Sequence, residues 1–224
     1  MIIVFGSLNL DLIAYVDALP QPGQTVPARS FRSEPGGKGG NQALAAARDG
    51  AAVAMVGAIG DDAFAVDMLG HLRAAGVDLQ RVARVAGASG CALIAADRHG
   101  RNSIIVNAGA NATVRAAQLP DALLGPATTL LLQMETPADE NADLIRRARA
   151  RAARIVLNLA PATALPDTAL RMLDWLVVNE AEAEWLAAAH GVEASAAALH
   201  AGFGTGVVRT LGAAGVEAAW RGGR

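Results

Sequence analysis

Short apolar runs alternate with longer amphipathic stretches along nearly the whole chain, and this rhythm limits the folds that the sequence can adopt. Between the runs lie Ala- and Leu-rich segments with helical periodicity, at 41–50, 62–75, 137–152 and 180–189. Strands that alternate with helices form parallel sheets covered on both faces. The sequence therefore predicts an α/β fold with three layers, α/β/α, around a mostly parallel central sheet. The runs predicted as buried strands are "IIVFG", "AVAMVGAIG", "TLLLQME", "RIVLNLAP", "WLVVNE" and "GVVRTLG".

Two segments interrupt this rhythm. Residues 11–34 and 88–107 combine Pro/Gly punctuation with a period-two alternation of apolar and polar residues, and the second contains a hairpin signal at "DRHGR". This pattern predicts the strands of a small separate sheet. Because the two segments flank a glycine-rich loop, we expect that sheet to form a flap over a site. No repeat or linker divides the sequence, so we expect residues 1–224 to form one domain.

The charge balance and the cysteine count exclude several classes of function. The chain carries 19 basic and 21 acidic residues, mixed along its length, and a net charge of −2. We expect no basic surface of the kind that attracts nucleic acid or anionic lipid. The apolar start of the chain is interrupted too early, by Asn9 and Asp11, for a signal peptide or a membrane span. The single Cys91 and four scattered histidines predict neither a disulfide nor a structural zinc site, and we expect a cytoplasmic protein.

The stretch "EPGGKGGNQALAAA", residues 34–47, places Lys38 between two pairs of glycines just before a predicted helix. Lys38 is the one lysine among the 19 basic residues, which indicates a position that needs a compact charge rather than a planar guanidinium. The loop is not a Walker loop, because Gly39 stands where that motif has Ser or Thr, and it lacks the G-x-G-x-x-G spacing. The simpler interpretation is a surface turn with a chance lysine.

Four glycines, at positions 36, 37, 39 and 40, leave the backbone of this loop bare up to a helix expected to begin near Asn41. Bare amides and a helix N-terminus can approach a polar ligand closely. We therefore expect a small, hydroxyl-rich ligand at this loop.

Polar side chains also stand at the ends of predicted strands. In "GSLNLDL", Asn9 and Asp11 are expected at the C-terminal end of the first strand, where residues two apart face the same side. An Asp beside an Asn can accept from and donate to vicinal hydroxyls, although polar residues that cap a strand end are also common. Glu135, which ends the run "LLLQME", is a third polar group of this kind.

Two later motifs have structural interpretations that need no ligand. In "VVNEAEAEWL", Asn179 at the N-cap and Glu182 at the third helical position predict a capping box. In "RTLGAAGVEA", the turn at 212–215 is bounded by glycines and is typical of an ordinary hairpin between two strands.

Taken together and in this order, the motifs resemble the ribokinase (PfkB-type) family of carbohydrate kinases. The resemblance extends over nearly all of the 224 residues and implies a ribokinase-like fold, in which the small sheet is a lid within 11–34 and 88–107 and a clasp between two copies of a homodimer. The matching segments are "GSLNLDL", "PQPGQTV", "GGKGGNQA", "GAIGDD", "NAGAN", "LLLQMETP", "NLAPA", "VVNEAEAE" and "TLGAAGV".

The resemblance implies that the chain takes part in the transfer of the γ-phosphoryl group of ATP to a primary hydroxyl of a pentose, D-ribose giving ribose 5-phosphate. It implies Mg²⁺, held through water near Asn179 and Glu182. The sugar ligands that it implies are Asn9, Asp11, Gly37, Lys38, Gly39, Gly40, Asn41 and Glu135. The ATP-binding residues that it implies are Asn179, Thr210, Leu211, Gly212, Ala213, Ala214 and Gly215.

The sequence departs from the family at its C-terminal side. The family's second signature, a Gly-Ala-Gly-Asp turn that supplies the catalytic base and an anion hole, is expected beyond Arg224, as are the segments that wrap adenine and hold a monovalent cation (K⁺). We therefore expect a C-terminally incomplete chain with no catalytic base in 1–224 and no activity as it stands. Two alternatives stay open: a non-catalytic sugar-binding or regulatory module, and a kinase for another furanose or a nucleoside.

Overall fold

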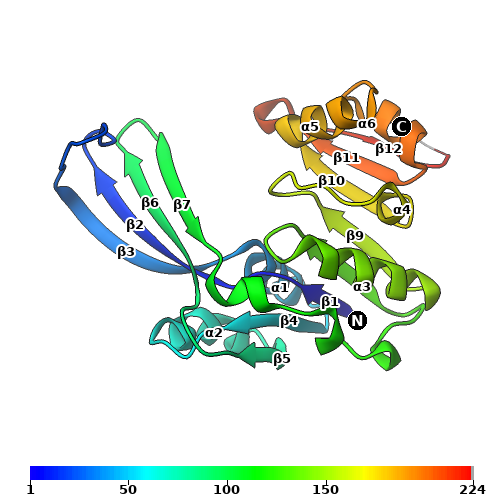
Figure 1. Cartoon of the computed structure of the whole chain (residues 1–224), viewed down its shortest axis with the longest axis horizontal. Helices are drawn as coiled ribbons and strands as arrows, with labels where there is room; N and C mark the ends of the chain where they lie inside the picture. Colours follow the sequence, from blue (N-terminus) through cyan, green and yellow to red (C-terminus); the bar gives the residue numbers. More distant parts are fainter. Residues whose placement is uncertain (223–224) are drawn as a thin grey trace.

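Eight strands form the central sheet of the computed structural model, which describes residues 1–222. Their order is β12-β11-β10-β9-β8-β1-β4-β5, and every neighbouring pair is parallel except β11 and β12 (Figure 1). The predicted, mostly parallel central sheet is thus confirmed. The strands are β1 Ile2–Phe5, β4 Val53–Ile59, β5 Asp78–Arg84, β8 Thr129–Gln133, β9 Arg154–Asn158, β10 Trp175–Asn179, β11 Gly206–Thr210 and β12 Val216–Ala219.

Successive strand residues point to opposite faces of the sheet. Both faces therefore carry apolar side chains, and helices cover both of them. Val4 and Met55 belong to one buried apolar cluster, together with residues of α1 and α2, whereas Ile3 and Leu130 belong to a second cluster with residues of α3. The three predicted layers are present. The helices are α1 Lys38–Arg48, α2 Phe64–Ala74, α3 Ala138–Ala150, α4 Asp167–Leu170, α5 Glu180–His190 and α6 Ala196–Phe203, with 3₁₀ turns η1 Gly109–Thr113, η2 Ala116–Gln118, η3 Asp121–Leu123 and η4 Gly212–Ala214.

A second sheet of four strands, in the order β3-β2-β6-β7, projects from one side of the central sheet (Figure 1). It consists of β2 Asn9–Val16, β3 Ala28–Gly36, β6 Gly90–Asp97 and β7 Asn102–Asn107. The small sheet predicted from 11–34 and 88–107 is confirmed, and so is the hairpin at "DRHGR", which joins β6 to β7. Asp97 holds this turn by accepting hydrogen bonds from the His99 amide at 2.9 Å and from Arg101 Nε at 2.8 Å.

Two predicted boundaries were wrong. Asn9 and Asp11 do not end the first strand: β1 stops at Phe5, and Asn9 begins β2 in the other sheet. Helix α1 begins at Lys38 rather than near Asn41, because Gly37 has a φ of 84° that stops the helix and the residues after it are already helical. Strand β5 and helix α6 were not predicted at all.

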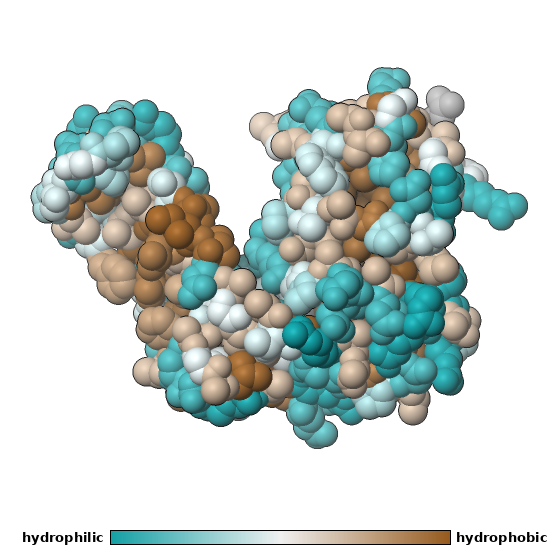
Figure 2. Space-filling model, viewed as in Figure 1, coloured by the Kyte–Doolittle hydropathy of each residue, from teal (hydrophilic) through white to brown (hydrophobic). Residues whose placement is uncertain are grey.

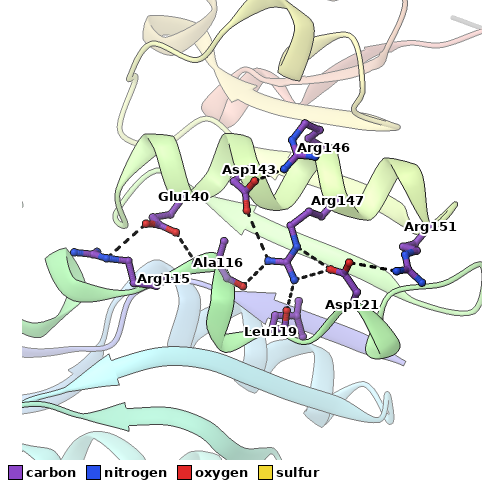
Figure 3. A network of polar contacts seen from close by, with 9 residues as sticks. All are labelled: Arg115, Ala116, Leu119, Asp121, Glu140, Asp143, Arg146, Arg147 and Arg151. Carbon is purple, nitrogen blue, oxygen red and sulfur yellow. Dashed lines mark hydrogen bonds and ion pairs between the residues drawn. The ribbon is translucent and has the colours of Figure 1, made fainter.

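Arg147 of α3 holds a neighbouring segment of the chain rather than pointing into solvent. The Arg147 side chain is only 17% exposed, and it donates to the carbonyl oxygens of Ala116 at 2.8 Å and Leu119 at 2.5 Å and to Asp121 at 2.8 Å (Figure 3). These carbonyls belong to the irregular segment that leads from the small sheet back to β8. A guanidinium has five donors in a fixed fork, so one side chain can serve several acceptors of this segment at once. Arg147 therefore fixes that segment to α3.

We expect Arg147→Ala to lower the free energy of unfolding by about 2 kcal/mol, because two backbone carbonyls lose a charged donor. Urea denaturation followed by circular dichroism measures the change. Arg146→Ala is the matched control, since the Arg146 side chain is 65% exposed and, within residues 1–222, pairs only with Asp143 in the same helix; it should cost less than about 0.5 kcal/mol. Equal losses for the two variants would contradict this role of Arg147.

Candidate functional site

A cavity of about 240 Å³ lies where the small sheet meets the N-terminus of α1. A larger cavity of about 440 Å³ adjoins it and shares Asn9, Lys38, Val106 and Glu135 with it. Together they bring six predicted site residues to one place, although these come from three distant parts of the sequence. The six are Asn9, Asp11, Gly37, Lys38, Asn41 and Glu135. A third cavity, of about 470 Å³ beside Ser195 and Trp220, contains none of the predicted site residues.

An ion pair between Lys38 and Glu135 forms the floor of the smaller cavity. Lys38 Nζ lies 3.0 Å from Glu135 Oε1, and the Lys38 amide and the Ser7 hydroxyl donate to Oε2 at 2.9 and 2.5 Å. Burial opposes the ionisation of Glu135, but these three donors outweigh it and hold the pKa of Glu135 below its ordinary value of 4.5. Glu135 is therefore a fixed carboxylate that ties the end of β8 to the start of α1.

Asp11 differs from Glu135 in its electrostatic surroundings. Its pKa is raised above the ordinary value of 3.8, first by burial and then by the negative charges of Glu135 and Glu34, while Lys38 acts in the opposite direction. The carboxylate lies over Gly36, where a Cβ atom would stand only 2.4 Å from it. Asp11 is thus the carboxylate of the cavity whose charge is least compensated, and its oxygens are available to a ligand that donates hydrogen bonds.

The glycines of the loop serve close packing as well as access. The amides of Gly39 and Gly40 donate to the Ser7 hydroxyl at 3.2 Å and to the Ser7 carbonyl at 2.9 Å. A Cβ at position 39 would come within 2.6 Å of the Ser7 backbone. Gly39 and Gly40 are buried and line neither cavity, whereas Gly37 lines the smaller one. The start of α1 therefore needs glycine in order to approach the chain segment that links the two sheets.

An apolar wall faces the polar floor. It consists of Ala92 and Ile94 on β6 and of Ile104 and Val106 on β7, which pair across the strands as Ala92 with Val106 and Ile94 with Ile104. Figure 2 shows hydrophobic residues gathered on the side of the small sheet that faces the rest of the molecule. We did not predict these positions as site residues, but the period-two alternation in 88–107 carried the necessary signal.

The predicted nucleotide residues lie, like Glu135, at the C-terminal ends of the parallel strands of the central sheet. Asn179 ends β10 and pairs in register with Thr210, which ends β11, and the segment 212–215 follows as an exposed turn before β12. The structure confirms both the hairpin and the capping box: the Asn179 amide donates to Glu182 Oε2 and the Glu182 amide to Asn179 Oδ1, each at 2.8 Å. β10 lies two strands from β8, or about 10 Å across the sheet. None of these residues lines the two cavities.

The described residues contain no cluster of three or more His, Cys, Asp or Glu side chains that could hold a metal ion by itself. Glu182 is 9% exposed, and the capping box occupies only one of its carboxylate oxygens. A single carboxylate, with water and ligand phosphates, is a common way for proteins to hold Mg²⁺, so the chemistry of Glu182 fits such an ion. Within 1–222, no helix is long and apolar enough to cross a bilayer.

Comparisons with known proteins show the family and the fold of this chain. The profile of the pfkB family carbohydrate kinases matches residues 1–222. A curated ribokinase of Bacillus subtilis is 38% identical over 188 residues, which are 83% of this chain and 64% of that protein. The chain spans less than two thirds of the length of this relative and of a Haemophilus influenzae ribokinase, which is 34% identical and covered to 61%. The solved structure of an Arabidopsis thaliana ribokinase complexed with ribose and ATP superposes with a TM-score of 0.82 at 26% identity, covering all of this chain and 75% of that one.

The pKa values of the two carboxylates give a direct test of the site. We expect Asp11 to titrate above 3.8 and Glu135 below 4.5 in an NMR titration of the carboxyl groups. Glu135→Gln should lower the pKa of Asp11, because it removes a neighbouring negative charge and frees Lys38 to pair with Asp11. Asp17→Asn, an exposed position just beyond the end of β2, is the control and should leave Asp11 unchanged. A pKa of Asp11 that does not respond to Glu135→Gln would show that the two carboxylates do not interact.

Proposed function

Because this chain belongs to the pfkB family of carbohydrate kinases, we propose that it binds D-ribose and ATP for the transfer of the γ-phosphoryl group to the primary hydroxyl, giving ribose 5-phosphate. The observation that carries the proposal is the cavity itself. Its floor is polar and its wall, on the small sheet, is apolar. A pentose presents hydroxyls on its rim and C–H groups on its faces, so it can hydrogen-bond to the floor and pack against the wall.

The charges of the floor favour a neutral polyol over an anion. Asp11 and Glu135 carry two negative charges against the single positive charge of Lys38, which is already paired with Glu135. A phosphate or a carboxylate placed here would meet net repulsion. Hydroxyl groups can donate to Asp11 and accept from Lys38, so a sugar satisfies both signs of charge.

We assign roles to the residues as follows. Asp11 accepts from two hydroxyls that do not react, Lys38 donates to a third oxygen, and Glu135 orients Lys38. Asn41, in the first turn of α1, adds a polar contact at the edge of the cavity. These groups hold the sugar in one orientation, which is the main contribution of a protein to phosphoryl transfer.

The nucleotide side of the proposal rests on Asn179, Glu182 and the turn 210–215. Backbone amides of an exposed glycine-bounded turn can approach a nucleotide closely, and Mg²⁺ would supply neutralisation of phosphate charge when bound. Glu182 would hold that ion through water while its other oxygen keeps the helix cap. The Arabidopsis ribokinase complexed with ribose and ATP supports this arrangement by its similar fold.

We also propose that two copies associate through the small sheet. The support is its exposed apolar surface: Phe31 on β3, Leu93 on β6 and Ile105 on β7 are 63%, 48% and 66% exposed. Several large apolar side chains exposed on one sheet are typical of an interaction surface. Sedimentation at several concentrations, compared with Ile105→Glu, tests the association.

Isothermal titration of the purified protein with D-ribose, 2-deoxyribose, fructose and adenosine tests the substrate. Saturable heat with D-ribose is the expected result. Heat with another of these compounds instead of D-ribose would identify that compound as the type of substrate that the chain binds. No heat with any of them would overturn the proposal. A parallel titration with a non-hydrolysable ATP analogue and Mg²⁺ separates a kinase from a sugar-binding module, which would bind sugar alone.

Asp11→Ala should weaken D-ribose binding by about 1.5–3 kcal/mol, or roughly 10- to 150-fold, because charge-assisted hydrogen bonds are the stronger ones. Since the pKa of Asp11 lies above 3.8 in the free protein, wild-type affinity should begin to fall on acidification above pH 3.8, as Asp11 becomes protonated. Asp11→Asn should lose this pH dependence. Asp17→Ala, which changes an exposed carboxylate outside the cavity, is the control and should bind normally. Normal affinity in Asp11→Ala would remove Asp11 from the site.

Lys38→Arg should also impair sugar binding, although it conserves charge. The planar guanidinium fork is wider than an ammonium group, and the smaller cavity has only about 240 Å³ to share with the sugar. The matched control is the reverse exchange, Arg48→Lys, at the exposed end of the same helix. Equal affinities of Lys38→Arg and wild type would mean that the lone lysine is accidental.

A further inference from the structure

Asn111, in the 3₁₀ turn η1, makes three buried hydrogen bonds at the point where the chain passes from one sheet to the other. Its Oδ1 accepts from the Leu8 amide at 2.9 Å, and its Nδ2 donates to the Leu8 carbonyl at 3.1 Å and to Asn9 Oδ1 at 2.7 Å. Asn111 is 2% exposed and Asn9 4%. Both protons of the Asn111 amide group are therefore used, and Asn111 itself has none to offer to a ligand.

The Leu8 backbone dictates which way both carboxamides point. A backbone N–H can only donate and a carbonyl can only accept, so Leu8 requires Asn111 to turn its oxygen toward the amide and its nitrogen toward the carbonyl. The remaining proton of Asn111 Nδ2 then requires an acceptor from Asn9. Asn9 must offer its oxygen, and its own amide nitrogen must point the other way.

That nitrogen, Asn9 Nδ2, faces the site. Asn9 lines both cavities, and within residues 1–222 no partner is found for its Nδ2. It is not among the buried side-chain atoms without a partner either, so the group is open to the cavity. Asp11 follows two residues later on the same face of β2 and presents an acceptor.

Gly90 makes room for this arrangement. It begins β6 directly opposite Asn9, and a Cβ there would lie 2.1 Å from Asn111 Nδ2 and 2.3 Å from Asn9 Oδ1. No residue other than glycine leaves space for the two carboxamides to meet.

We infer that Asn111 is a positioning residue for the substrate: it orients the Asn9 carboxamide so that Asn9 donates a hydrogen bond to a substrate oxygen while Asp11 accepts from a hydroxyl. The pair thereby selects a polyol with an acceptor and a donor at neighbouring positions. This role rests on the proposed sugar binding, but the orientation of Asn9 in the free protein does not depend on it.

Hydrogen exchange of the side-chain amides, followed by NMR, tests the orientation without any ligand. In the wild-type protein the Asn111 amide protons should exchange slowly, whereas those of Asn9 should exchange fast and become slow when D-ribose is added. Asn111→Asp removes the donor, so Asn9 should turn its nitrogen toward the carboxylate that this substitution introduces. The Asn9 protons should then be protected without sugar, and D-ribose affinity should fall about tenfold, the upper range for one hydrogen bond.

A double-mutant cycle tests whether Asn111 acts through Asn9. If it does, Asn111→Asp should weaken ribose binding in the wild-type background but cause no further loss in Asn9→Ala. Additive losses would indicate a merely structural role and overturn the inference, as would slow exchange of the Asn9 amide in the free wild-type protein. If Asn111→Asp does not fold, Asn9→Asp decides instead: it keeps the acceptor for Asn111 and should melt near wild type but bind ribose about tenfold more weakly. A wild-type protein that binds no D-ribose would contradict the proposed function and, with it, the positioning role. The exchange rates would still establish how Asn9 is oriented.

Discussion

Ser7 and Leu8 lie in the short link, residues 6–8, that carries the chain out of the central sheet and into the small one, and the site depends on the hydrogen bonds that their backbone makes. Both residues are buried, so unpaired amides and carbonyls would be costly here. The Gly40 amide, in the first turn of α1, donates to the Ser7 carbonyl, and the Asn111 side chain hydrogen-bonds to both the amide and the carbonyl of Leu8. The glycine loop and the 3₁₀ turn η1 are thus fixed to the same short link. These hydrogen bonds hold in place the residues that form the floor of the cavity beside the link.

Two parts of the molecule contribute opposite chemistry to the cavity. The end of β8 and the start of α1 supply the paired charges of Glu135 and Lys38, while β6 and β7 supply the apolar wall. Asp11 belongs to the small sheet, but it lies close enough to Glu135 and Lys38 for their charges to shift its pKa. Any change in the angle between the two sheets would therefore move the wall and one carboxylate together relative to the remaining charges. Such coupling can make ligand binding and the position of the small sheet interdependent.

Local patterns were sufficient for much of this fold and for little of the site geometry. Apolar runs predicted six strands of the central sheet, and the sequence of Asn179 to Glu182 predicted a capping box that the structure contains. Strand β5 was missed because its residues, Asp78 to Arg84, include three charged side chains and form neither an apolar run nor a regular alternation, which an edge strand can tolerate. The bonds of Glu135 to Lys38 and of Asn111 to Leu8 join residues 97 and 103 positions apart. No periodicity within one segment can reveal such contacts. The sequence of the loop therefore predicts a bound ligand beside its glycines but does not show that Gly39 and Gly40 pack against Ser7.

The position of β1 in the sheet order has a consequence for how the chain reaches this structure. β1 precedes both of its partners in the sequence, and it lies between β4 and β8, with Ile2 opposite Val53 on one side and Thr129 on the other. Its second partner is therefore separated from it by more than half of the 224 residues. Closing so long a loop costs entropy before any contact repays it, and proteins dominated by such pairings fold slowly. Until β8 arrives, the apolar edge of β1 is a natural target for chaperones during translation.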